Sequence, residues 1–142
     1  LAGEPIQLVD GGHQRRSFTF IEDGIECLMR IIENRDNRAS GGIFNIGNPD
    51  NDLSVRELAE KLIALVAEYP EFRSRAEGCR IVETTSDTYY GKGYQDMLNR
   101  VPSIRNARER LGWAPRTGID EALRKTLDFY LVEQKEKTGH LL

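Results

Sequence analysis

The stretch SFTFIEDGIECLMRIIE, residues 17–33, changes its pattern of hydrophobic residues partway along. Ser17–Phe20 has the aromatic and threonine content of a β-strand. The residues after it favour a helix over Glu22–Glu33 and a loop over Asn34–Ser40, because apolar residues recur at helical spacing, at Ile21, Ile25, Leu28 and Ile32. A strand that passes into a helix is typical of an α/β fold.

Short strands and helices also alternate along the rest of the chain. Strands are predicted at Gln7–Asp10, Gly42–Asn48 and Arg80–Thr85. Ser54–Glu57 (SVRE) is a capping box, in which the serine hydroxyl and the glutamate carboxylate bind each other's unpaired backbone N–H groups. The helix that it opens is expected to end near Tyr69-Pro70, and a charged loop is expected over residues 71–78.

Two further helices are predicted in the last third of the chain. Ser103 is expected to cap a short helix over Ile104–Leu111 that ends at Gly112. The last helix is expected to begin at Thr117, with Asp120 at the capping-box position and a stripe of Ile119, Leu123, Leu127 and Leu131. Ser86–Val101 has no clean period. The sequence therefore predicts an α/β fold without internal repeats.

Composition and charge limit the possible functions. The 142 residues, 39% of them hydrophobic, fit one ordinary domain with a true core. The net charge of −3 argues against a constitutive nucleic-acid binder. The longest apolar run, Leu62–Ala67, is far shorter than the roughly 20 residues of a membrane helix, and Leu1–Pro5 shows no signal-peptide pattern. We therefore expect a cytoplasmic protein with no nucleic-acid partner and no membrane insertion.

The chain offers few groups for metal or redox chemistry. Two widely separated cysteines, Cys27 and Cys79, and two histidines at opposite ends, His13 and His140, predict no zinc site, and Cys27 is best explained as a small buried hydrophobe. Gly91-Lys92-Gly93 comes nearest to a dinucleotide-binding turn, but it lacks a third glycine and the flanking strand and helix. The sequence contains no P-loop, no plausible Ser/His/Asp triad and no Tyr followed four residues later by Lys.

Two polar segments are candidates for binding. Asp10–Arg16 (DGGHQRR) is either a hairpin loop with solvated arginines, which ranks first on sequence statistics, or an anion clasp built from glycine and arginine. Tyr89–Asp96 (YYGKGYQD), with Arg100 beyond it, is either a surface loop or a site where tyrosines stack on a base or sugar. For this second segment, the binding interpretation ranks at least as high as the surface-loop interpretation.

Four segments, in this order, resemble the C-terminal part of extended short-chain dehydrogenases that act on nucleotide sugars. They are Arg16–Asp23 (RSFTFIED), Phe44–Asn48 (FNIGN), Arg100–Ala107 (RVPSIRNA) and Leu111–Pro115 (LGWAP). The run Ser86–Arg100 is similar, more narrowly, to the decarboxylase domain of the bifunctional UDP-glucuronate decarboxylase/UDP-4-amino-4-deoxy-L-arabinose formyltransferases of polymyxin resistance. The resemblance covers the last portion of that domain, less than half of it.

The resemblance implies an NAD-dependent enzyme that takes part in the aminoarabinose modification of lipid A. Its substrate, UDP-glucuronate, is oxidised at C4, and the resulting β-keto acid loses CO₂ because the 4-keto group accepts the electrons as an enolate. Reprotonation gives a UDP-4-keto-pentose. The NAD-binding glycine turn and a catalytic Tyr/Lys pair are expected upstream. Residues 1–142 would then be a partial domain of a homo-oligomeric parent, without turnover when isolated.

The resemblance also implies roles for residues of this chain. Arg100 occupies the proton donor's position, although a guanidinium with a pKa above about 12 suits electrostatic stabilisation of a carboxylate or enolate better. Arg16 is expected to clasp the diphosphate, and His13 stands where close relatives tend to have Lys. The implied substrate-binding residues are Gln7, Leu8, Val9, Asp10, Gly11, Gly12, His13, Gln14, Arg15, Arg16 and Tyr94.

Two alternative functions stay open at this point. One is a sibling nucleotide-sugar epimerase or dehydratase, against which only the run Tyr90–Tyr94 (YGKGY) argues. The other is a non-catalytic module that binds UDP-sugars or serves in assembly, with its helices as subunit contacts.

Overall fold

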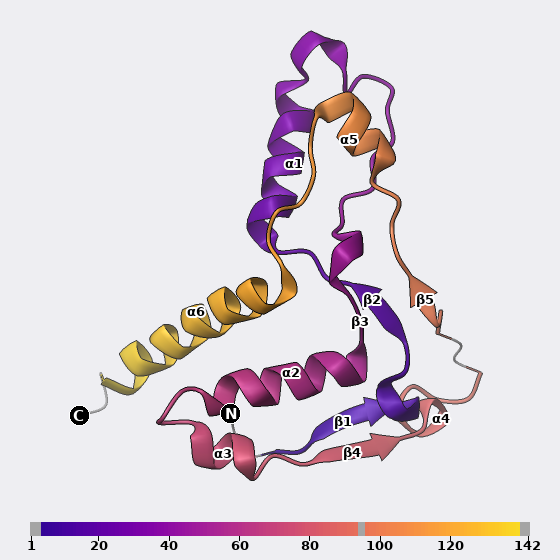
Figure 1. Ribbon diagram of the computed structural model, residues 1–142. Helices are drawn as coiled ribbons and strands as arrows, with labels where there is room; N and C mark the ends of the chain where they lie inside the picture. Colours follow the sequence, from indigo (N-terminus) through magenta and orange to yellow (C-terminus); the bar gives the residue numbers. More distant parts are fainter. Residues whose placement is uncertain (1–3, 94–95, 140–142) are drawn as a thin grey trace.

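The computed structural model of the chain describes residues 4–93 and 96–139, and in the last helix it describes side chains as far as Leu131. Figure 1 shows helices α1 (Ile21–Glu33) and α5 (Arg105–Leu111) side by side at one end, with helix α2 (Val55–Ala67) lying along a small sheet at the other. Helix α6 (Ile119–Gly139) leaves from between them. In the described residues, no helix combines the length and apolar character needed to cross a bilayer.

Across residues 4–93 and 96–139, the strands form two separate small sheets. In the first, β1 (Ile6–Val9) runs parallel to β4 (Ile81–Thr84). In the second, β2 (Arg15–Ser17) lies between β3 (Asp52–Ser54), which is antiparallel to it, and β5 (Asn99–Arg100), which is parallel. A 3₁₀ turn over Asp10–Gly12 carries the chain from the first sheet into the second.

A tryptophan holds the α1 end of the molecule together. Trp113 is 1% exposed and packs with Cys27, Ile104 and Ala107. Its indole Nε1–H donates to the main-chain oxygen of Asp23 at 3.0 Å, and the Asp23 carboxylate accepts from the backbone N–H of Thr117, also at 3.0 Å. Burial raises the pKa of the Cys27 thiol. The prediction that Cys27 is a small buried hydrophobe is therefore confirmed.

Several predicted helix features are confirmed. Helix α1 covers the predicted span and starts one residue earlier, at Ile21. Both hydrogen bonds of the capping box between Ser54 and Glu57 are present at the start of α2. Gly112 ends α5 in the left-handed conformation, with φ 63°.

Other helix predictions are wrong. The predicted loop over residues 71–78 contains a short helix, α3 (Arg73–Glu77). Ser103 does not cap α5, because the capping position is Ile104 and no side chain bonds there. Instead, the Ser103 carbonyl accepts a bond from the Asn45 amide. Helix α6 begins at Ile119, two residues after the predicted start at Thr117, whose backbone N–H is already bonded to Asp23.

Two strand predictions also need correction. The predicted strand over Ser17–Phe20 is displaced to Arg15–Ser17, because Phe18 and Phe20 turn away to line a hollow against α6. Strand β2 does not pair with β1, so the hairpin interpretation of Asp10–Arg16 is wrong. Gly42–Asn48 forms no strand within the described structure. The Asn106 side-chain amide donates to the Ile43 carbonyl, and the Asn45 side-chain amide donates to the Ser103 carbonyl.

Candidate functional site

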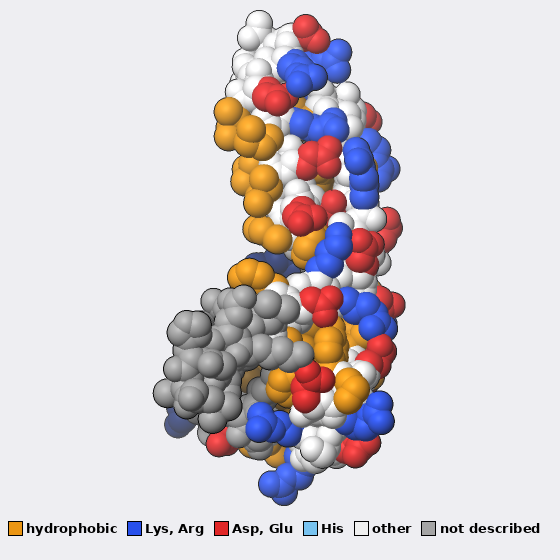
Figure 2. All heavy atoms as spheres, turned by 90° about the vertical axis from the view of Figure 1, so that its left-hand side faces the viewer, with side chains coloured by type: hydrophobic (Ala, Val, Ile, Leu, Met, Phe, Trp, Pro, Cys, Tyr) orange, Lys and Arg blue, Asp and Glu red, His pale blue; other side chains and the backbone are white. Residues whose placement is uncertain are grey.

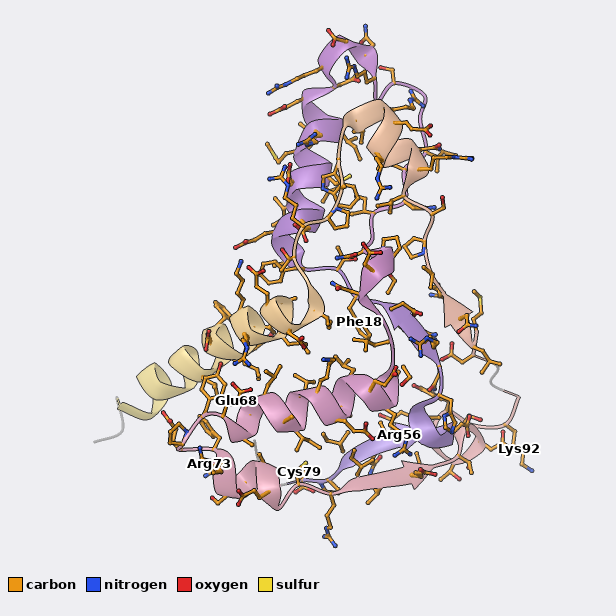
Figure 3. The ribbon with its side chains drawn as sticks, viewed as in Figure 1. Phe18, Arg56, Glu68, Arg73, Cys79 and Lys92 are labelled. Carbon is orange, nitrogen blue, oxygen red and sulfur yellow. The ribbon has the colours of Figure 1, made fainter. Side chains whose placement is uncertain are left out.

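The turn after β1 owes its glycines to packing within the protein. Gly12 has φ +69°, and a Cβ there would lie 3.1 Å from both the backbone N of Arg56 and a Leu8 methyl carbon. Gly11 has φ +72°, and its carbonyl accepts a 2.9 Å bond from Arg56 Nε. Figure 3 shows Arg56 reaching from α2 to this turn, where it also forms an ion pair with Glu83 of β4. The glycines therefore fit the turn tightly against the start of α2.

The remaining residues of the predicted binding loop differ in exposure. Leu8, Gly11 and Gly12 are buried, whereas Gln7, Asp10 and His13 are exposed, and Val9 and Gln14 are half-buried. Both hydrogen bonds of Gln14 are to neighbouring backbone groups: its side-chain amide donates to the Val9 carbonyl at 3.4 Å, and its main-chain carbonyl accepts from the Val55 backbone N–H. Leu8 belongs to the interior, so only part of the loop can meet a ligand.

Arg15 is paired with two carboxylates. Its Nε donates to Asp52 Oδ2 at 2.9 Å, and its Nη1 donates to Glu57 Oε2 at 3.2 Å. The Asp52 bond is the main cause that raises the pKa of Arg15. Glu57 is at the same time the capping-box residue of α2, so Arg15 fastens β2 to the start of that helix.

Arg16 is paired with an acid that the sequence reasoning missed. Its Nη2 donates to both carboxylate oxygens of Asp96 at 2.7 Å, and its Nη1 donates to the carbonyls of Arg15 and Met97. No local pattern reveals this pair, because the two residues are 80 positions apart. A diphosphate could meet the fork of Arg16 only by replacing Asp96.

Arg100 lies next to Arg16 across the β2–β5 pairing, with the two residues in register. Arg100 is exposed, and in the described structure its side chain makes a weak contact from Nη2 to Met97 Sδ at 3.8 Å. The structure thus brings the predicted loop and the predicted catalytic residue together. It leaves the positive charge of Arg100 available while the charges of Arg15 and Arg16 are bound to acids.

Other parts of the second predicted segment lie apart from this arrangement. Figure 3 shows Lys92 in the turn beyond α4 (Ser86–Tyr89), at the edge of the molecule. The two neighbouring tyrosines, Tyr89 and Tyr90, are exposed and contact each other edge to face at 4.8 Å between ring centres. Tyr94, predicted to contact the UDP-sugar, lies outside the described residues.

A hollow of about 310 Å³ adjoins the loop. It is lined by Asp10, Gly11, His13, Glu83, Thr84 and Thr85. The Ser86 backbone N–H donates to Asp10 Oδ1 at 2.9 Å, which ties α4 to the turn after β1. Two carboxylates, those of Asp10 and Glu83, line the hollow and would repel an anion. An anionic ligand is therefore expected on the side of the loop where Arg100 lies.

Comparisons with known proteins agree with the predicted fold. The NAD dependent epimerase/dehydratase family matches residues 1–47. A short-chain dehydrogenase/reductase superfamily protein from Agrobacterium tumefaciens, solved with bound NAD, superposes with a TM-score of 0.63 at 19% identity, over 98% of this chain and 37% of that one. The chain has the α/β fold of the extended short-chain dehydrogenases.

Two other structures are more similar in sequence. PbgP3 from Burkholderia pseudomallei is 50% identical, with a TM-score of 0.74 over 86% of this chain and 33% of that one. MoeE5, solved in complex with UDP-glucuronic acid and NAD, is 26% identical, with a TM-score of 0.62 over 87% of this chain and 36% of that one. The chain thus spans about a third of the length of these two proteins.

Proposed function

We propose that this chain is the C-terminal, UDP-sugar-binding part of an NAD-dependent enzyme that decarboxylates UDP-glucuronate to a UDP-4-keto-pentose. The observation that carries the proposal is the pairing of β2 with β5, which places Arg100 beside the loop Asp10–Arg16. MoeE5, whose structure holds UDP-glucuronic acid, supports this substrate class. The parent's place in lipid A modification and polymyxin resistance belongs to the same proposal.

Arg100 is assigned the central role because it is the loop's neighbouring cation without an acidic partner in the described structure. A guanidinium offers planar N–H donors that match a carboxylate, and its charge stabilises an enolate as negative charge develops. The same cation would hold the carboxylate of UDP-glucuronate before CO₂ is lost. A proton for the product carbon is more easily supplied by water than by arginine.

NAD is bound in the MoeE5 structure and in the Agrobacterium tumefaciens structure, and it is proposed as the cofactor of the parent enzyme. The residues described in this chain do not fit its pyrophosphate. Gly91 is preceded by the short helix α4 and is followed by neither a strand-to-helix turn nor a long helix, which a dinucleotide site requires. The NAD contacts are therefore assigned to the part of the enzyme outside this chain.

Calorimetric titration of the chain with UDP-glucuronate tests the role of Arg100. Arg100→Ala should weaken binding about tenfold or more, because a hydrogen bond to a charged group contributes roughly 1.5–3 kcal/mol. The control is Arg80→Ala, which removes an exposed arginine just before the start of β4, at the end of that strand away from the predicted loop. It should leave the affinity unchanged. An Arg100→Ala protein that binds as tightly as the wild type would overturn the assignment.

Substrate choice separates decarboxylation from the chemistry of sibling enzymes. The intact parent should release CO₂ from UDP-glucuronate and leave UDP-glucose and UDP-galactose unchanged. Interconversion of UDP-glucose and UDP-galactose would instead identify an epimerase. Absence of turnover with all three, together with UDP binding, would identify a non-catalytic module.

A further inference from the structure

Three successive residues of the predicted binding loop adopt the left-handed backbone conformation. Asp10 has φ 47°, Gly11 has φ 72° and Gly12 has φ 69°. Glycine reaches this region without steric cost, whereas a residue with a Cβ, such as Asp10, is uncommon there and persists when its surroundings hold it. The shape of this turn therefore depends on contacts that reach it from other elements.

The first two residues of helix α2 supply such contacts. The Val55 backbone N–H donates to the main-chain carbonyl of Gln14 at 3.0 Å. The next residue, Arg56, donates from its Nε to the Gly11 carbonyl at 2.9 Å. The start of α2 thus binds the loop at two points, one on each side of Gly12, and only the Arg56 contact is made by a side chain.

The Arg56 guanidinium joins three elements at this place. It extends from α2, donates to the turn after β1, and forms an ion pair through Nη2 with Glu83 of β4, the residue opposite Leu8 in the β1–β4 register. A guanidinium is planar and rigid, so the position of Nη2 on Glu83 fixes the direction in which Nε points. Glu83 therefore orients Arg56 toward the Gly11 carbonyl.

The ion pair alone does not single out Arg56. Figure 2 shows Lys and Arg side chains next to Asp and Glu side chains down one side of the molecule, so paired charges are common on this protein. What distinguishes Arg56 is that its other donor is spent on the backbone of a left-handed turn in the predicted binding loop. Its side chain is 31% exposed, compared with 63% for Glu83.

We propose that Arg56 is a positioning residue for ligand binding, which holds the turn Asp10–Gly12 in the shape in which the loop meets a UDP-sugar. Glu83 assists by orienting it. The proposal rests on the proposed function of the loop and adds to it two residues that lie outside the loop. Apparent affinity falls in proportion to the fraction of protein in the binding-competent shape, so loss of this contact weakens binding without removing any group that touches the ligand.

Two possible roles of Arg56 predict opposite effects of removing Glu83. If the charge of Arg56 attracted or touched the ligand, Glu83→Ala would strengthen the binding of an anion, because it frees the guanidinium and removes a carboxylate from the hollow beside the loop. If Arg56 holds the turn, Glu83→Ala weakens binding, because the guanidinium loses the partner that orients it. The sign of the change separates the two roles.

Calorimetric titration of the chain with UDP and with UDP-glucuronate measures that sign. We expect Glu83→Ala and Arg56→Met each to weaken the binding of both ligands about tenfold, since each loses a hydrogen bond to a charged group. Glu83→Gln keeps an oxygen acceptor for the guanidinium and should recover most of the affinity. The control is Arg108→Met, at an exposed position of α5 at the other end of the molecule, and it should bind as the wild type does.

Hydrogen exchange in the chain without ligand gives an independent measurement. In Glu83→Ala the Val55 N–H, which donates to the loop at Gln14, should exchange about tenfold faster, while the Ala122 N–H, which donates to the Gly118 carbonyl in α6, should keep its rate. Tighter binding by Glu83→Ala, or an unchanged Val55 rate, would overturn the proposal. A wild-type chain that binds no UDP-glucuronate would contradict the proposed function instead, and the Val55 rate would still decide whether Glu83 and Arg56 hold the loop.

Discussion

Arg16 shows at the scale of a single residue why a side chain's role depends on its partners. The sequence places an arginine in a glycine-containing loop, which favours a diphosphate clasp. In the structure the four N–H groups on its two terminal nitrogens point at Asp96, Met97 and the Arg15 carbonyl. Arg16 thereby holds the strand that carries Arg100, and this positioning precedes any contact with a ligand.

Replacing the acid should loosen that strand. In Asp96→Asn the charge-assisted pair is lost, so the Arg15 backbone N–H, which donates to the Leu98 carbonyl at 2.7 Å, should exchange with solvent about tenfold faster. Hydrogen-exchange NMR measures the rate. Asp36→Asn is the control, because its ion pair with Arg38 spans 3.5 Å between exposed side chains. An unchanged Arg15 rate would show that Asp96 does not hold the strand.

At the scale of the element, the start of α2 combines local and distant interactions. The Ser54 hydroxyl accepts from the Glu57 backbone N–H at 3.1 Å, and the Glu57 carboxylate accepts from the Ser54 backbone N–H at 2.7 Å. Ser54→Ala should lower the free energy of unfolding by about 1 kcal/mol in urea denaturation. Ser103→Ala is a matched control with almost no expected loss, since Ser103 caps nothing. Equal losses would mean that the cap contributes nothing specific.

The same helix start should respond to acid. The hydrogen bonds from Ser54, followed by the nearby Arg15, lower the pKa of Glu57 from its usual 4.5. Because the folded pKa is the lower one, the stabilisation is complete above pH 4.5 and disappears as the pH falls through the folded value. Glu57→Gln should therefore lose less stability than the wild type between about pH 7 and pH 3. Urea denaturation midpoints at the two pH values measure this, with Glu60→Gln as the control. A loss of stability on acidification that is equal in Glu57→Gln and in the wild type would contradict the prediction.

Local patterns predicted the elements that local chemistry determines. Helix α1, the capping box of α2 and the end of α5 at Gly112 all follow from residues within one or two turns. The very short strands β2, β3 and β5 do not, because they exist only through pairing between distant segments. Gly42–Asn48 has the composition of a strand, but no strand pairs with it in the described structure, so that prediction is wrong.

The candidate site was predictable to a similar degree. The resemblance named the loop and Arg100, and the register of β2 with β5 brings them together. The acids that occupy Arg15 and Arg16 were not predictable, since Asp52 and Asp96 meet them only through folding. Their effect is to distinguish three arginines that look equivalent in the sequence, and to leave Arg100 as the one that faces solvent without an acid in the described structure.

At the scale of the whole molecule, binding and chemistry should separate. The chain spans about a third of its neighbours' length, and its described residues hold no turn that fits the NAD pyrophosphate. Hydride transfer needs an acceptor held against C4 of the sugar, so the chain alone, mixed with UDP-glucuronate and NAD, should release no CO₂ and form no NADH. Radiometric CO₂ capture and NADH absorbance measure this, and the titration heat of UDP-glucuronate in the same sample confirms that the ligand is bound. Release of CO₂ above the level of a no-protein control would show that these 142 residues contain a complete reaction centre.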